Sequence, residues 1–189
     1  MISINHYITW NLGDSMPFNS INSEELLLKY MQKNITYGFV TKNGKKLLSE
    51  DEWHAFEADC LVQTGNSILN TQVGTCWDQV ELERLWFTSH NYHIKTYFLY
   101  FEGINNTPTH TFLLYEKNNN WYWFENAFES YRGIHAFKDL ESAINKVKEC
   151  HLKYTLKNHK VNENSLKIKE YQGLTKNLSI NDFLKHVLS

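Results

Sequence analysis

Apolar side chains recur at the spacing of an amphipathic helix in several separate segments of the chain. Most of these segments begin with a residue that can cap a helix, and Ser23, Ser49, Asp139 and Ser179 stand at such positions. The pattern predicts helices over residues 22–33, 49–56, 76–87, 139–153 and 179–189.

The middle of the chain has a different pattern, with aromatic and β-branched runs that are typical of strands. These runs cover residues 92–102, 109–116 and 121–128, and a further edge strand is predicted over residues 165–172. The asparagine-rich segment 117–120 predicts a hairpin turn between two of the strands. Helices, then strands, then helices indicate an α+β fold.

Composition limits the class of protein. A chain of 189 residues with 42% hydrophobic and 15% aromatic residues predicts a single folded domain over residues 1–189. The net charge of -2 gives no basic excess for nucleic acid, and no apolar run approaches the roughly 20 residues that span a membrane. We therefore expect neither nucleic acid nor membrane as a partner. The oligomeric state is left open.

The cysteine content and the N-terminal residues bear on the compartment. The chain has three cysteines, Cys60, Cys76 and Cys150, which suit a reducing cytoplasm better than a disulfide scaffold. The first residues, MISINHYITWNLGDS, lack the basic start and apolar block of a signal peptide. We expect a cytoplasmic protein in which Cys60 and Cys150 are core thiols.

Cys76 stands at a distinctive position. The turn at Gly74 and Thr75 leads directly into Cys76, which opens the predicted helix GTCWDQVELERLWF. The free N–H groups and positive partial charge of a helix N-terminus favour a thiolate, which is the reactive form. The alternative is that Cys76 is only a small apolar residue that packs well.

A reactive thiolate needs a base and a third group that orients the base. His110 lies near the start of one predicted strand, and Glu125 and Asn126 lie on the next. Side chains alternate between the faces of a sheet, so a hairpin loop with an even number of residues would place Glu125 on the face of His110. A loop with an odd number would place Asn126 there. We predict Glu125 as the third residue, with Asn126 as the alternative.

The segments GTCWDQVELERLWF and THTFLLYEKNNNWYWFENAF resemble the transglutaminase-like (papain-related) cysteine protein superfamily over about residues 50–135. That family places a cysteine at a helix N-terminus, a histidine on a following strand and an aspartate one strand later. A tryptophan commonly precedes the acid by four residues, as Trp121 precedes Glu125. Here glutamate replaces the usual aspartate, and HTF replaces the usual HAW around His110.

The resemblance implies a cysteine-bearing helix packed on an antiparallel sheet, with helical additions at both ends of the core. It also implies a hydrolase or acyl transferase of the peptidase, deamidase or transglutaminase type. Such an enzyme would act on an amide or ester, in a protein or peptide substrate, through a thioester. The alternative is a non-catalytic peptide- or protein-binding member of the same fold.

Further residues around the nucleophile have expected roles. The backbone N–H of Cys76 is the first candidate for an oxyanion hole, and the resemblance to papain-like enzymes makes Gln72 a candidate second donor. Trp77 and His135 are candidates to line the cleft.

Metal binding is not expected. His90 and His93 lie outside a helix that would support their spacing, and no cysteine is near them in the sequence. We therefore predict no metal site and no cofactor.

Overall fold

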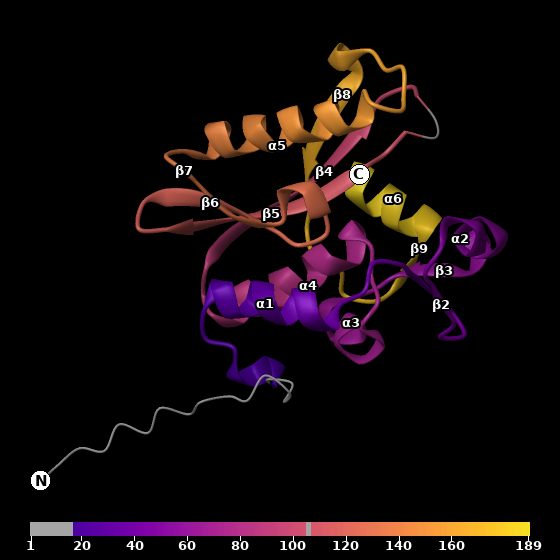
Figure 1. Cartoon of the computed structure of the whole chain (residues 1–189), viewed down its shortest axis with the longest axis horizontal. Helices are drawn as coiled ribbons and strands as arrows, with labels where there is room; N and C mark the ends of the chain where they lie inside the picture. The colour runs from indigo at the N-terminus through magenta and orange to yellow at the C-terminus, as the bar shows by residue number, and fades with distance from the viewer. Residues whose placement is uncertain (1–16, 105–106) are drawn as a thin grey trace, which may run out of the picture.

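The structure is a computed structural model that describes residues 17–104 and 107–189. The N-terminal segment for which no signal peptide is expected lies outside the described residues. A five-stranded antiparallel sheet with the order β7-β6-β5-β4-β8 forms the centre (Figure 1). Its strands are β4 (His93–Phe101), β5 (His110–Lys117), β6 (Asn120–Glu125), β7 (Gly133–Phe137) and β8 (Leu166–Glu170). The prediction of an α+β fold is confirmed, as is the edge strand over residues 165–172.

Helices cover both faces of this sheet (Figure 1). Helix α5 (Leu140–Thr155) packs on one face, and α1 (Glu24–Asn34) and α4 (Cys76–Ser89) lie on the other. The remaining helices are α2 (Glu50–Phe56), α3 (Gly65–Thr71) and α6 (Ile180–Leu188). Among the described residues, no helix has the length and apolar character needed to cross a membrane.

The predicted helix starts are confirmed. The side chains of Ser23, Ser49, Asp139 and Ser179 each accept a hydrogen bond from a backbone N–H three residues later. These bonds satisfy donors that the first helical turn leaves free. Local capping chemistry therefore determines where these four helices begin.

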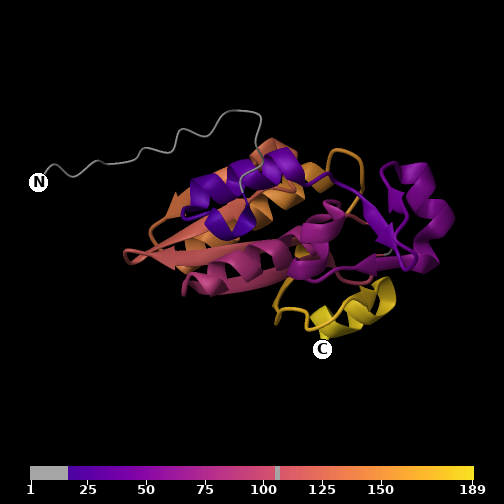
Figure 2. The ribbon, with the colours of Figure 1, turned by 90° about the horizontal axis from the view of Figure 1, so that it is seen from below.

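A smaller sheet with the order β2-β1-β3-β9 lies at one end of the molecule, beside α2 and α6 (Figure 2). Its strands are β1 (Phe39–Thr41), β2 (Lys46–Leu47), β3 (Cys60–Val62) and β9 (Leu178–Ser179). The sequence pattern did not predict this sheet, because strands of two or three residues are too short to show a period of two.

The hairpin between β5 and β6 fixes which side chains share a face. Lys117 pairs with Asn120, so only Asn118 and Asn119 form the loop. Both have positive φ angles, 53° and 62°, as a type I′ turn requires. This loop has an even number of residues, and His110 and Glu125 lie on the same face of the sheet. The sequence predicted this arrangement for an even loop.

Helix α4 is buried along most of its length and is held firmly at its N-terminus. Asp78 accepts hydrogen bonds from Thr75 N at 2.8 Å and from Gln63 N at 2.7 Å. A Cβ at Gly74 would lie 2.6 Å from Cδ1 of Ile68, so the turn before α4 requires glycine. These contacts fix the position at which the nucleophile helix begins.

Candidate active site

Cys76 is the first residue of α4 and is 7% exposed. Its carbonyl oxygen accepts a hydrogen bond from Thr111 Oγ1 at 2.5 Å. Thr111 directly follows His110 at the start of β5. The first turn of α4 therefore lies against the end of the strand that carries the predicted base.

His110 and Glu125 form a buried pair. His110 Nε2 lies 2.8 Å from Glu125 Oε2, and the two side chains are only 6% and 3% exposed. Glu125 also accepts hydrogen bonds from Trp123 Nε1 at 3.2 Å and from Phe128 N at 2.7 Å. Three donors around one carboxyl match an ionised glutamate, which can only accept. The carboxylate in turn fixes the orientation of the imidazole ring.

The surroundings of His110 favour its charged form. Burial by itself lowers the pKa of His110, but the charge of Glu125 and hydrogen bonds with Cys76 and Glu125 raise that pKa to about 10. An imidazolium stabilises a neighbouring thiolate by opposite charge. The structure thus pairs His110 with Glu125 and places the first turn of α4, which begins with Cys76, against the start of β5.

A second histidine lies behind this pair and has the opposite protonation preference. The ring centroids of His110 and His151 are 6.1 Å apart. Burial, followed by the nearby charge of His110, lowers the pKa of His151 to about 3. Its Nε2 lies 3.2 Å from the carbonyl oxygen of Pro108, so the neutral ring donates there. Sequence reasoning missed His151, because it lies on α5 at a position that reads only as part of a helix.

Asn126 does not lie beside His110. Its Nδ2 donates to Gln79 Oε1 at 2.7 Å, and Gln79 Nε2 donates to the carbonyl oxygen of Gly74 at 2.8 Å. Asn126 therefore contacts the nucleophile helix, on the face of the sheet opposite to Glu125. The alternative of Asn126 as the partner of His110 does not fit this geometry.

The two oxyanion candidates differ in their surroundings. The backbone N–H of Cys76 opens α4, where it has no partner within the helix. Gln72 ends α3 in a left-handed conformation, with φ 56°, and is exposed. Its backbone oxygen accepts a hydrogen bond from Thr36 N at 2.8 Å. Gln72 thus anchors the neighbouring loop through its backbone.

That loop brings Tyr37 to the nucleophile. Thr36 O accepts a hydrogen bond from Gly74 N at 3.0 Å, which aligns residue 37 with the turn before Cys76. Tyr37 is 55% exposed, and its hydroxyl lies near the Cys76 side chain and backbone. Burial of the hydroxyl, followed by the charges of Cys76 and Asp78, raises the pKa of Tyr37 well above its usual value. Tyr37 therefore remains a hydrogen-bond donor. No sequence motif links it to Cys76.

The predicted cleft residues lie on two sides of the site. Trp77 is half-buried, and its Nε1 donates to Thr109 Oγ1 at 3.1 Å, beside His110. His135 lies on β7, where its ring is tilted against Trp123 with the centroids 5.0 Å apart, and its Nε2 lies 2.7 Å from the carbonyl oxygen of Tyr131. Trp77 is thus close to the reacting groups, and His135 lies behind the Glu125 side of the site.

The other two cysteines are buried in the core. Cys60 lies in β3, and burial followed by nearby acidic charges raises the pKa of its thiol to about 11. Cys150 lies in α5, and burial likewise raises the pKa of its thiol. Burial and a raised pKa both favour the unreactive thiol form of these two cysteines.

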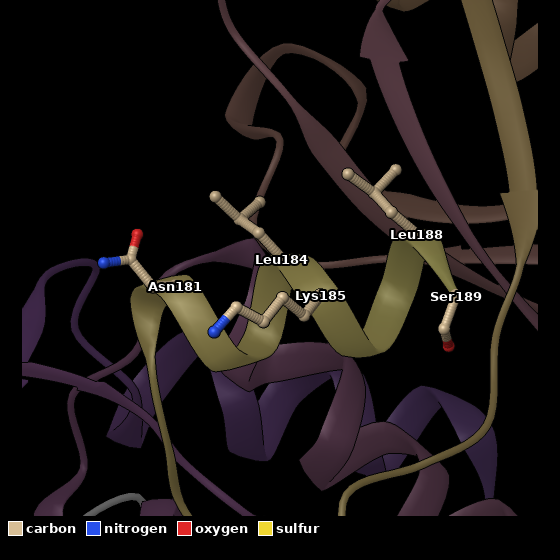
Figure 3. A pocket seen from close by; sticks show the side chains of 5 residues that line it. All are labelled: Asn181, Leu184, Lys185, Leu188 and Ser189. Atoms are coloured by element: carbon tan, nitrogen blue, oxygen red, sulfur yellow. The ribbon is translucent and has the colours of Figure 1, made fainter.

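Among the described residues, no group of three or more His, Cys, Asp or Glu side chains is arranged to hold a metal ion. An open hollow runs along α6 (Figure 3). Its lining residues are Asn181, Leu184, Lys185, Leu188 and Ser189. None of them belongs to the group around Cys76.

Comparison with known proteins finds no family model, no curated protein and no solved structure that matches this chain. The geometry around Cys76, His110 and Glu125 is therefore the observation on which a function depends.

Proposed function

We propose that the chain is a transglutaminase-like cysteine hydrolase or acyl transferase that acts on an amide or ester through a thioester. One observation carries this proposal. The buried His110–Glu125 pair, with Nε2 and Oε2 2.8 Å apart, lies beside a thiol at the first position of a helix. A nucleophile, a base and an orienting group in contact are the requirements of nucleophilic catalysis by cysteine.

The chemical steps follow from these positions. The sulfur of Cys76, ionised beside the protonated His110, forms a bond to the substrate carbonyl carbon. The carbonyl π electrons move to oxygen and return as the bond to the leaving group breaks. His110 gives its proton to the departing amine or alcohol. Water or an amine then attacks the thioester, passing a proton to His110, and the thiolate leaves. Apart from the substrate and the attacking water or amine, these steps use only Cys76 and His110.

The developing negative oxygen needs donors aimed at it. The backbone N–H of Cys76 supplies one donor. We assign the second to the Tyr37 hydroxyl, which is protonated and lies near that N–H. Gln72 contributes through its backbone contact with the Tyr37 loop. This arrangement differs from the expected glutamine side chain.

The surface near Cys76 suits a peptide or protein substrate. Half-buried Trp77 and Phe39 have ring centroids 6.4 Å apart, and the ring of Phe39 stacks on Trp53 at 5.2 Å. Aromatic side chains of this kind bind apolar parts of a peptide. All three cysteines are free, which fits a reducing compartment such as the cytoplasm.

Alkylation of the folded protein tests the nucleophile. A free thiol is only about 3% ionised at pH 7, so an ionised Cys76 would react up to about 30-fold faster than free cysteine. We expect mass spectrometry to show iodoacetamide on Cys76 long before it appears on Cys60 or Cys150. The variant His110→Ala should lose this advantage, while the matched variant His151→Ala should keep most of it.

Equal alkylation of the three cysteines in the folded wild type would count against an enzyme. It would favour the alternative, a peptide- or protein-binding module that uses the same fold. Circular dichroism of each variant separates a loss of reactivity from a loss of structure.

A further inference from the structure

Two buried oxygen atoms near the site lack a hydrogen-bond partner within the described part of the chain. They are Oε2 of Glu83 and Oδ1 of Asn126, and both residues are 2% exposed. An unpaired buried polar atom costs about 1–3 kcal/mol, so each of these two oxygens needs an explanation.

The chemistry of the neighbouring amides fixes which atom of Asn126 is unpaired. The carbonyl oxygen of Gly74 can only accept, so the group of Gln79 that faces it is the Nε2 donor. Gln79 Oε1 then faces Asn126 and must receive a donor, which is Nδ2. Asn126 Oδ1 is therefore an acceptor that needs a donor from another residue.

Glu83 is placed to supply that donor. It lies one helical turn after Gln79, on the same buried face of α4. Burial, followed by the charge of Glu125, raises the pKa of Glu83 well above its usual value. A neutral carboxylic acid carries one O–H donor, whereas an ionised carboxylate carries none. One proton on Glu83 resolves both unpaired oxygens.

We infer that a protonated Glu83 donates to Asn126 Oδ1 and completes a buried series of hydrogen bonds from Glu83 through Asn126 and Gln79 to the Gly74 carbonyl. This hydrogen-bond network positions the turn that precedes Cys76. Glu83, Asn126 and Gln79 are thus positioning residues, and their effect on reactivity rests on the function proposed above. Asn126 directly follows Glu125 at the end of β6. Glu125 orients the imidazole of His110, and Asn126 positions the turn before Cys76.

The protonation of Glu83 is measurable without any assay of activity. Isotope-edited infrared or carbon NMR spectra of the wild type at pH 7 should contain the signal of one protonated carboxyl group. That signal should vanish in Glu83→Gln and persist in the control Glu149→Gln, which removes an exposed carboxyl on α5. A wild-type spectrum with every glutamate ionised would overturn the inference.

Three single variants and one double variant test the positioning role through the alkylation rate of Cys76. Glu83→Gln keeps a neutral donor of the same size, so its rate should stay within about twofold of the wild type. Glu83→Met and Asn126→Ala should each slow the rate by about tenfold, because the turn loses its anchor. The double variant Glu83→Met/Asn126→Ala should be no slower than the worse single variant.

The outcomes separate the two proposals. Equal alkylation rates for Glu83→Gln and Glu83→Met would overturn the proposed hydrogen-bond network. Additive losses of rate in the double variant would overturn it as well. An unreactive Cys76 in the wild type would count against the enzyme, whereas the carboxyl spectrum would still decide the protonation of Glu83.

Discussion

Glu125 and Asn126 are neighbours in sequence, yet their side chains lie on opposite faces of the sheet. Glu125 Oε2 is 2.8 Å from His110 Nε2, and Asn126 Nδ2 is 2.7 Å from Gln79 Oε1. Both residues thus have a defined partner near Cys76. The acid orients the imidazole, and the amide contacts the helix that carries the thiol.

Removing the charge of Glu125 should weaken the base. We expect Glu125→Gln to lower the pKa of His110, because the charge of Glu125 is the main influence that raises it. Alkylation of Cys76 at pH 7 should slow by about 10- to 100-fold, the scale on which a positioned base contributes. Proton NMR of the imidazole and the alkylation rate measure the two effects. The control Glu129→Gln, an exposed residue after β6, should change neither.

The His110–Glu125 pair should make stability depend on pH. The pKa of His110 is about 10 in the folded state and about 6.5 in an unfolded chain. Because the folded value is the higher one, the stabilisation is fully present below pH 6.5 and is lost as pH rises through 10. Urea unfolding at pH 6, 8 and 10 should show a shrinking difference between the wild type and His110→Gln. A constant difference across that range would contradict a charged His110.

The hydroxyl of Tyr37 should matter for acyl chemistry but not for alkylation. Loss of one oxyanion donor typically costs about 10²- to 10³-fold in turnover. We therefore expect Tyr37→Phe to slow release of nitrophenol from p-nitrophenyl acetate by that factor. Its reaction with iodoacetamide, which forms no oxyanion, should stay within about threefold of the wild type. Tyr30→Phe, on α1, is the matched control.

Asp78 should be important for stability. Replacement by alanine leaves the backbone N–H groups of Thr75 and Gln63 without an acceptor in a buried site. We expect Asp78→Ala to lower the free energy of unfolding by about 2–4 kcal/mol in urea titration. Asp182 occupies the equivalent position in the exposed cap of α6, so Asp182→Ala should cost less than about 1 kcal/mol. Similar losses for both variants would argue against a special role of the α4 cap.

Local chemistry made much of the fold predictable. Ser23, Asp139 and Ser179 mark helix starts because a capping side chain acts within three residues of itself. Glu125 could be assigned only conditionally, because its face depends on the loop length. The positive φ angles at Asn118 and Asn119 settle that length.

Contacts between distant segments could not be predicted in the same way. Tyr37 reaches Cys76 through a loop that pairs with residues 72–74, and the sequence carries no local sign of that pairing. The spacing from Trp121 to Glu125 also did not identify the tryptophan that contacts Glu125. Trp123, two residues before Glu125 on the same face, is the tryptophan that donates to it. Alternation along β6 was a signal that could have identified Trp123.

The two-residue turn at Asn118 and Asn119 has an evolutionary consequence. A shift of β6 by one residue relative to β5 would turn every side chain of the strand to the other face. Asn126 would then meet His110, and Glu125 would meet α4. One codon gained or lost near this turn, if it moved the register, would exchange a Cys-His-Glu arrangement for a Cys-His-Asn arrangement without altering any of the four residues. Proteins descended from one ancestral hairpin can therefore differ in the residue that orients the histidine through a change in the length of the hairpin loop alone.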